Sequence, residues 1–236
     1  MDARAKPQRL TACSGCAMAP LCEAAEPQPG LPAVSCRVRL ERSERLFTAG
    51  EPQDAIYAVR AGFLKATVPV PGSGEHIVRF LLPGEVVGLE GIEAKRHATS
   101  AIALEACEVC EVPLRRAQFL SDAYPAVAVH LRRLLGNQLA RTQSQLAALT
   151  HLSAPQRVAA FLLDVAQRWE DRGYAGRAFR LPMERREIAD GLGLTIETVS
   201  RLLADFRARG WVAVRGREVE ILDAESLANC PRVAKA

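Results

Sequence analysis

The chain has 236 residues, of which 49% are hydrophobic and 25% are charged, and its formal net charge is +4. This length and composition exclude a disulfide-stapled miniprotein and a disordered chain, because the protein can bury a core of its own. No apolar run approaches the ~20 residues that span a bilayer, and residues 1–13 lack the apolar stretch of a secretory signal, so we expect a cytoplasmic protein with no membrane contact.

Residues 1–36 are rich in Pro, Ala, Gly and Cys and show no hydrophobic period, which predicts an irregular segment that a ligand must order. Three of the seven cysteines lie here within ten residues, in CSGCAMAPLC at 13–22. In a reducing cytoplasm, clustered thiols indicate metal or redox chemistry more often than structural disulfides. From Leu10 to Cys36 there is no Lys or Arg, so we expect backbone amides alone to donate hydrogen bonds to a bound anionic group.

Residues 37–120 contain short apolar or alternating runs: AIYAV, GFLKATVPV, HIVRFLL, EVVGL and TSAIALEACEVCEVPL. Gly and Pro turn signals such as PGSG separate these runs. Many short strands with regular turn signals are typical of an all-β roll or barrel, so we predict a jelly-roll-like sensor domain here.

Residues 121–152 predict a long helix, because no proline follows Pro125 and one set of mainly apolar positions recurs at alternating spacings of three and four. The helix could simply pack on its own domain. We favour a dimerisation helix, because the stripe is narrow and nearly heptad-like. The predicted seam consists of Leu131, Leu135, Gln138, Thr142, Leu146 and Leu149.

Residues 153–236 predict a DNA-binding domain. Ser153 and Gln156 have the spacing of a capping box at the start of a helix, and Pro155 suits the first turn. Between His151 and Arg217 there are twelve arginines, no lysine and eight acidic residues, so this block carries all of the chain's excess positive charge. That distribution is typical of nucleic-acid binding on an otherwise neutral protein.

The run RREIADGLGLTIETVSRLLADFRARG, at residues 185–210, predicts a helix-turn-helix. Ala189 is small where two helices approach each other, Gly193 can take the positive φ of the turn, and Val199 faces the same core. The second helix begins near Thr195, which can cap it. The following WVAVRGREVEIL predicts a hairpin, as in the wing of a winged helix.

The first turns of that second helix would meet base edges in the major groove. Arg201 can donate two hydrogen bonds to guanine, Glu197 can accept one from cytosine, and Ser200 is less selective. We expect phosphate contacts from Arg185, Arg186, Thr195 and Arg207. The alternative is a helical hairpin of an enzyme, in which Glu197 and Arg201 form only an i,i+4 ion pair.

The order of β-roll, long helix and a helix-turn-helix reading LGLTIETVSRLL resembles the bacterial family of the catabolite activator protein and the fumarate-and-nitrate-reduction regulator. The resemblance extends from Cys13 to about Leu227. It implies an α+β fold with a cyclic-nucleotide-binding-like β-roll, a long dimerisation helix and a C-terminal winged helix-turn-helix. It also implies a homodimeric regulator, often an activator and not an enzyme, that binds palindromic double-stranded DNA and contacts RNA polymerase.

Two branches of that family are distinguished by their ligands. The cyclic-AMP branch uses a Gly-Glu pair, present here as Gly84 and Glu85, and an Arg-Ser or Arg-Thr pair that holds the phosphate. His97 and Ala98 fall at the latter positions, although Arg96 is one place away. The Ile-Glu-Thr-Val-Ser-Arg run from Ile196 instead resembles the oxygen-responsive branch, whose operator has the form TTGAT-N4-ATCAA.

The oxygen-responsive branch holds a [4Fe–4S] cluster on Cys-x2-Cys-x5-Cys and a fourth cysteine about ninety residues later. Cys13, Cys16 and Cys22 match that spacing. The fourth ligand is Cys107 or Cys110, which on one strand would point to opposite faces. The family's Cys-Glu-hydrophobic-Pro pattern falls on Cys110. The resemblance thus implies that oxygen destroys a cluster on Cys13, Cys16, Cys22 and Cys110 and so weakens the dimer on its operator.

Other interpretations of these residues stay open. Four thiolates also suit zinc, and a disulfide-based switch is a third possibility. A regulator of the same fold could respond to a cyclic nucleotide, or to haem or nitric oxide. An Fe–S enzyme with an accessory DNA domain is a remote alternative, since the sequence shows no Gly-rich nucleotide loop and no catalytic acid–base set.

Overall fold

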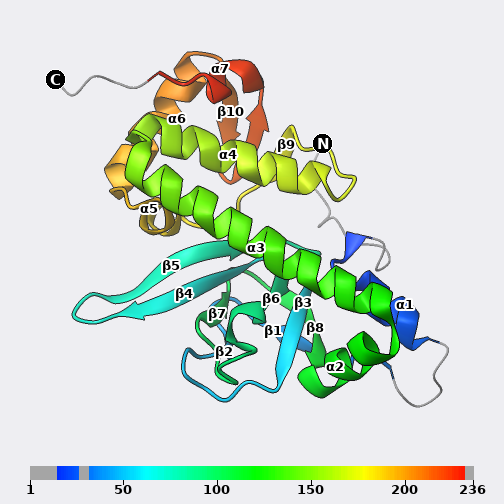
Figure 1. Ribbon diagram of the computed structural model, residues 1–236. Coiled ribbons are helices and arrows are strands. Elements are labelled where there is room, and N and C mark those ends of the chain that lie inside the picture. The colour runs from blue at the N-terminus through cyan, green and yellow to red at the C-terminus, as the bar shows by residue number, and fades with distance from the viewer. Residues whose placement is uncertain (1–14, 27–31, 232–236) are drawn as a thin grey trace. The chain divides into compact units, whose positions relative to one another are not determined.

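The computed structural model describes residues 15–26 and 32–231 (Figure 1). They form two compact units. One contains the described residues up to Ala66 together with Phe80–Arg132, and the other contains Thr67–Arg79 and Arg133 onward. The first unit holds most of the β-roll, and the second holds the helix-turn-helix.

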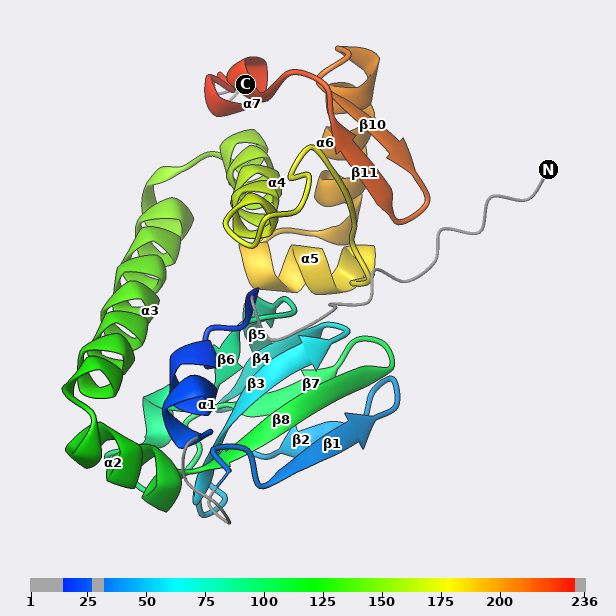
Figure 2. The same ribbon diagram turned by 90° about the vertical axis from the view of Figure 1, so that its right-hand side faces the viewer.

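Two four-stranded sheets make up the β-roll, with strand orders β1-β8-β3-β6 and β2-β7-β4-β5 (Figure 2). The central strand β8 pairs antiparallel with β1 on one side and β3 on the other. The strands are β1 (Cys36–Leu40), β2 (Arg45–Phe47), β3 (Ala55–Ala61), β4 (Leu64–Val70), β5 (Gly74–Leu81), β6 (Val86–Val87), β7 (Ser100–Ala103) and β8 (Cys107–Pro113), and the 3₁₀ turn η2 (Leu89–Gly91) follows β6.

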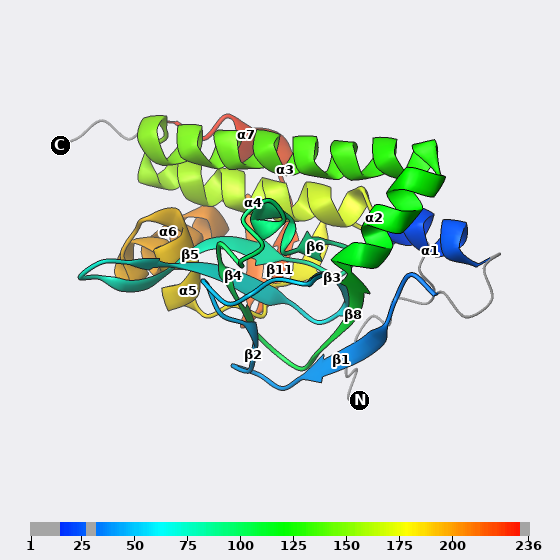
Figure 3. The ribbon, with the colours of Figure 1, turned by 60° about the horizontal axis from the view of Figure 1, so that its bottom comes forward.

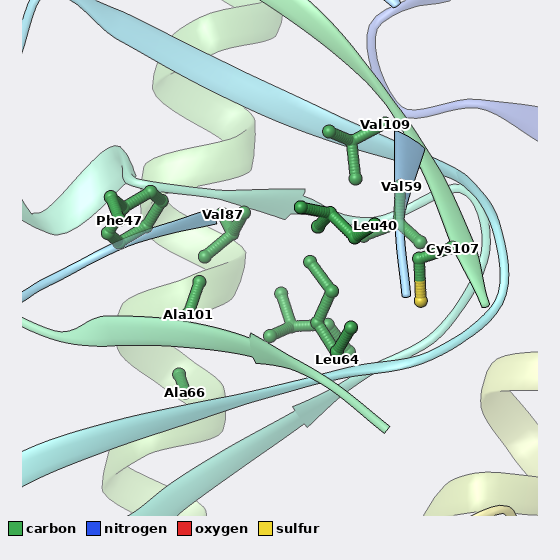
Figure 4. Close-up of a cluster of buried hydrophobic side chains, with 11 residues drawn as sticks. Leu40, Phe47, Val59, Leu64, Ala66, Val87, Ala101, Cys107 and Val109 are labelled. Atoms are coloured by element: carbon green, nitrogen blue, oxygen red, sulfur yellow. The ribbon is translucent and has the colours of Figure 1, made fainter. Parts of the chain in front are cut away.

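The core of the roll lies between the two sheets, where side chains from both inner faces meet (Figure 4). Leu40, Val59 and Val109 come from the β1-β8-β3 side, and Leu64 and Ala101 come from the opposite sheet. The alternation of inward apolar and outward polar residues that predicted the strands also generates this core. The predicted β-roll is therefore confirmed.

Two parts of the first unit differ from the prediction. Strands β1 and β2 were not predicted, because CRVRLERSERLF is dominated by charges on its outward face. The segment predicted to be irregular contains the helix α1 (Ala19–Ala25), in which Leu21 and Ala25 are buried. A seven-residue helix has little stability alone, so its sequence signal is weak and tertiary burial supports it.

The predicted long helix begins at Pro125, after which the predicted helical run has no further proline. Pro113 precedes the helix α2 (Leu114–Ala123), and Pro125 is the first residue of the helix α3 (Pro125–His151). Tyr124 between them is extended, with φ −128° and ψ 101°, as expected for a residue that precedes proline. Figure 3 shows α2 running into the start of α3, with α1 beside α2, which it contacts.

From Ser153 onward the second unit forms a winged helix-turn-helix, as predicted. The predicted capping box opens its first helix, with the Ser153 amide donating to Gln156 Oε1 at 3.1 Å. The wing is the hairpin β10–β11, which pairs with β9 to give the sheet order β10-β11-β9. The elements are α4 (Ala154–Glu170), β9 (Ala178–Arg180), α5 (Arg185–Leu192), α6 (Ile196–Ala208), β10 (Val212–Arg215), β11 (Glu218–Ile221) and α7 (Ala224–Ala228).

Among the helices of the described residues, none is both long and apolar enough to cross a membrane. The longest, α3, carries arginines and glutamines along its length.

Two glycines with nearly the same backbone conformation predict different costs of substitution. Gly62 has φ +78°, and a Cβ there would lie 2.5 Å from the Ala106 carbonyl oxygen and 2.6 Å from Cys107 Sγ. Gly72 has φ +77° and open space around it. We expect Gly72→Ala to lower the free energy of unfolding by about 1–2 kcal/mol through backbone strain alone. We expect Gly62→Ala to cost about 1–3 kcal/mol more, because it also overpacks the core.

Urea denaturation of the two variants beside the wild-type protein measures both costs. Equal losses at the two positions would contradict the close approach of the β3–β4 turn to β8.

Candidate functional site

The helix-turn-helix has the geometry that its sequence predicts. Gly193 ends α5 in the left-handed conformation, with φ 61° and ψ 44°. The amide of Leu194 donates to the Ala189 carbonyl at 2.9 Å, which closes the turn. Ala189 and Val199 are both buried, at 2% and 0% exposure, so the two helices approach through small side chains.

The N-terminal half of α6 presents the predicted base-reading side chains to solvent. Thr195 caps the helix, its Oγ1 accepting from the Thr198 amide at 3.2 Å. Glu197, Ser200 and Arg201 are exposed, whereas Val199 and other apolar residues of α6 are buried on the opposite face. The helix is therefore amphipathic, with a polar face available to a partner.

The predicted phosphate-contacting residues lie around the same helix. Arg185 and Arg207 line one hollow together with Ser200, against Val214 of the wing. Arg185 Nη2 also donates to the Gly216 carbonyl at 3.4 Å, and burial lowers the pKa of Arg185. Arg186 differs, because its Nε pairs with Glu184 Oε2 at 2.8 Å while its side chain remains mostly exposed. The structure thus brings Arg185, Ser200 and Arg207 together at one hollow beside α6.

The predicted seam on α3 is only partly apolar and is largely exposed. Leu135, Leu146 and Leu149 are 44%, 62% and 42% exposed, and Thr142 is exposed as well. Leu131 and Gln138 are half-buried. Leu139, which the prediction omitted, is 61% exposed. Exposed leucines repeated along one helix indicate a surface that a partner covers.

The segment that carries Cys16 and Cys22, called the cysteine loop below, is attached to the rest of the first unit at Ala17. Ala17 lies between Cys16 and the buried Met18. The Ala17 amide donates to the Gly84 carbonyl at 2.8 Å, which joins the loop to the turn before β6. The Ala17 carbonyl accepts from Nε2 of His130 at 2.6 Å, which joins the loop to the first part of α3. The Met18 amide lies 3.4 Å from Cys16 Sγ and donates to it. One residue of the loop therefore connects the β-roll with the long helix.

The two candidates for the fourth ligand lie on opposite faces of β8, as their spacing predicts. Cys107 points into the core between the sheets (Figure 4), is 5% exposed, and donates from Sγ to the Phe63 carbonyl at 3.1 Å. Burial raises the pKa of the Cys107 thiol to about 11. Cys110 lies on the outer face and is half-buried, as are Cys16 and Cys22. These surroundings favour Cys110 as the ligand.

Cys110 has a basic neighbour that its surroundings in sequence do not reveal. Arg37 of β1 is directly opposite Cys110 in the antiparallel pairing, so the two side chains share a face. Arg37, Arg39 and Arg60 surround Glu108, with Arg39 Nε 3.5 Å from its carboxylate, and the hydrogen bond from Arg60 lowers the pKa of Glu108. Leu10–Cys36 contains no Lys or Arg, but the sheet brings Arg37 of β1 opposite Cys110 of β8. That only backbone amides donate to a bound anionic group stays a prediction.

Cys13 lies outside the described residues. Within residues 15–26 and 32–231, no three His, Cys, Asp or Glu side chains are grouped as a metal site. The chemistry of the remaining donors still fits an Fe–S cluster, because Cys16, Cys22 and Cys110 are thiols in partly exposed positions. Cys36 is exposed and Cys230 is buried, and neither is near a predicted ligand in the sequence.

The residues that align with the cyclic-nucleotide-binding positions make contacts within the chain. Glu85 is buried, and its carboxylate accepts from the Leu82 amide at 3.1 Å. His97 is 4% exposed and stacks on Phe47 with ring centroids 3.6 Å apart. Arg96 Nη1 donates to the Gly50 carbonyl at 2.7 Å. His97, whose pKa is lowered by burial, stands at the alignment position of the phosphate's guanidinium partner. An imidazole lacks the two parallel donors with which a guanidinium holds a phosphate.

Comparisons with known proteins match both halves of the chain. The profile of the Crp-like helix-turn-helix domain matches residues 156–230, and that of the cyclic nucleotide-binding domain matches residues 37–124. Among solved structures, FixK2 from Bradyrhizobium japonicum is similar, with a TM-score of 0.76 and 28% identity, and the match covers 85% of this chain and 98% of that one.

Curated relatives match over most of their length. The transcriptional regulatory protein btr of Bordetella pertussis is 38% identical, with 91% of each chain covered. The transcriptional activator protein anr of Pseudomonas aeruginosa is 38% identical, with 95% of this chain and 93% of the relative covered. The anaerobic regulatory protein of Haemophilus influenzae is 36% identical over 80% of this chain and 73% of its own.

The environments of Cys107 and Cys36 predict different reactivities toward an alkylating reagent. Because burial raises the pKa of Cys107 to about 11, only about one molecule in a thousand carries its thiolate at pH 8. We expect iodoacetamide to label the exposed Cys36 readily at pH 8 and to leave Cys107 unlabelled, and labelling of Cys107 to rise as the pH approaches 11. Peptide mass spectrometry measures both sites in one sample.

The same labelling in concentrated guanidinium chloride is the control, because unfolding makes the two thiols equivalent. Equal labelling of Cys36 and Cys107 in the folded protein at pH 8 would show that Cys107 is not a core residue.

Proposed function

Because the chain belongs to the CRP/FNR family of transcription regulators, in the FNR-like branch of anaerobic regulators, we propose that it senses oxygen through a [4Fe–4S] cluster. DNA binding and transcription regulation follow from the family itself. The cofactor, the operator and the coupling between them are the proposal.

The proposed ligands are Cys13, Cys16, Cys22 and Cys110. The observation that carries the assignment is the separation of the two cysteines of β8, one in the apolar core and one on the outer face. A bound cluster would supply reactivity toward oxygen, and thiolates are its usual ligands. Arg37, across the strand pair from Cys110, places positive charge beside an anionic centre.

The chain's own contacts provide a route from the cysteines to the dimer. Ligation by the four cysteines would fix the cysteine-bearing segment to β8 and would keep Ala17 in place between Gly84 and His130, whose backbone and ring it contacts. His130 lies only one residue before Leu131, where the predicted seam begins. An ordered loop therefore supports the first turns of α3, and coupling of this kind typically amounts to ~1–3 kcal/mol.

We propose that α3 forms a homodimer through the seam of Leu131, Leu135, Gln138, Thr142, Leu146 and Leu149. The exposed leucines support this, since they leave apolar surface uncovered in one chain. A two-fold dimer would place its recognition helices about 34 Å apart, one turn of DNA. The operator is then a palindrome of the TTGAT-N4-ATCAA form.

On that operator, Glu197, Ser200 and Arg201 read base edges, while Arg185, Arg186, Thr195 and Arg207 contact the phosphate backbone. The exposed polar face of α6 and the hollow lined by Arg185 and Arg207 support this division. RNA polymerase is the proposed protein partner of the DNA-bound dimer.

Matched alanine variants of the two cysteines of β8 test the cofactor. We expect Cys110→Ala, purified without oxygen, to lose iron, acid-labile sulfide and visible absorbance, and to bind the operator no better than air-exposed wild-type protein. Cys107→Ala should keep all of these properties at a modest cost in stability, because it removes a core thiol.

Metal analysis decides between the remaining interpretations of the cysteines. Retention of the cluster by Cys110→Ala and its loss from Cys107→Ala would contradict the ligand assignment. Colourless anaerobic protein containing zinc would contradict the cluster itself.

A second pair of variants tests the reading of DNA. We expect Arg201→Ala to lower the affinity for TTGAT-N4-ATCAA by about 1–3 kcal/mol and to relax selectivity at the contacted base pair. Arg207→Ala should weaken binding to operator and scrambled DNA alike. It should also reduce the slope of log affinity against log salt concentration by about one. Fluorescence anisotropy at several salt concentrations measures both effects, and a uniform loss in Arg201→Ala would contradict base reading.

A further inference from the structure

Arg157 stands in the first turn of α4, where a cation is electrostatically unfavourable because the helix dipole is positive there. Its backbone amide already donates to the Ser153 carbonyl within the helix. The Arg157 side chain instead has partners outside α4.

Those partners are backbone carbonyls at the ends of two other helices in the same unit. Arg157 Nε donates to the Leu152 carbonyl at 3.0 Å, immediately after α3 ends. Its Nη1 donates to the Leu192 carbonyl at 3.1 Å and lies 3.5 Å from the Gly193 carbonyl. One guanidinium thus caps the negative C-terminal ends of both α3 and α5.

The contact is located at the turn of the helix-turn-helix. A Cβ added to Gly193 would lie 3.5 Å from Arg157 Nη1 and 3.6 Å from Leu149 Cδ2. Leu149 belongs to the last turns of α3. The end of α3, the guanidinium and the turn between α5 and α6 are therefore packed together.

Leu152 and Ser153 are the whole connection between α3 and α4. Rotation in this connection would swing the helix-turn-helix relative to α3. We infer that Arg157 is a positioning residue for DNA binding, whose guanidinium fixes the angle between the dimerisation helix and the recognition helix. In a dimer, that angle sets the separation of the two recognition helices and hence the spacing of half-sites that the protein accepts.

The shape of the guanidinium is essential to this role. Its planar fork can donate to carbonyls on two helices in fixed directions, whereas a lysine ammonium is a compact charge on a flexible stem. Arg157→Lys therefore keeps the charge and loses the geometry. Arg157→Gln removes the charge as well, so the pair separates positioning from simple attraction to phosphate.

The test uses oxygen-free protein and three kinds of DNA duplex: TTGAT-N4-ATCAA, the same half-sites separated by three or five base pairs, and a single TTGAT half-site. The inference about Arg157 rests on the proposed operator and the proposed dimer. We expect wild-type protein to prefer the four-base-pair spacing. Arg157→Lys and Arg157→Gln should each lose at least about tenfold of that preference, since the loss of even one hydrogen bond to a charged group amounts to about a decade.

Single-half-site affinity and salt dependence should stay the same in both variants, since no phosphate contact is lost. That result also shows that the helix-turn-helix of the variant is folded. Arg207→Gln is the control, because the loss of a phosphate contact should lower both the single-half-site affinity and the salt slope.

Three results would overturn the inference. They are an unchanged spacing preference in both variants, full function in Arg157→Lys with loss in Arg157→Gln, and a reduced salt slope. Failure of the wild-type protein to prefer TTGAT-N4-ATCAA over scrambled DNA would instead contradict the proposed operator, and equal wild-type binding at all spacings would overturn the positioning role as well.

Discussion

The backbone of Ala17 bonds to two separate elements of the first unit, and the proposed sensing mechanism depends on this double attachment. Its amide is bonded to Gly84 beside β6 and its carbonyl to His130 on α3. Met18 and Leu21 beside it are buried, at 1% and 0% exposure. The segment that carries two of the proposed ligands is thus also the segment that touches the helix of the proposed dimer.

The arrangement offers a route by which a small change at the proposed ligands would alter the proposed dimer interface. The α1 helix has only seven residues and little stability of its own, so its order depends on burial and on attachment at its N-terminal side. Because several leucines of α3 are exposed, we expect the proposed dimer to respond to a modest change in the order of the first turns of α3. At the C-terminal end of α3, Arg157 donates to carbonyls at the ends of α3 and α5. By the inference above, this guanidinium sets the direction of the recognition helix relative to α3.

Local sequence patterns predicted the elements whose residues decide their own conformation. The Gly193 turn, the Thr195 cap and the Ser153 capping box are local, and each appears as predicted. Features created by contacts between distant segments were not predictable. Arg37 stands opposite Cys110 only because β1 pairs with β8, and α1 forms because the rest of the unit buries its apolar side chains. The same reasoning explains why the three carbonyl partners of Arg157 have no signature in the sequence around it.

Hydrogen–deuterium exchange on oxygen-free and air-exposed protein tests the central claim most directly. The account predicts that the Ala17 amide and the amides of residues 125–132 in α3 are protected without oxygen and lose protection together in air. Loss of protection in residues 15–26 with unchanged protection at the start of α3, while the dimer still dissociates, would contradict the proposed connection through Ala17.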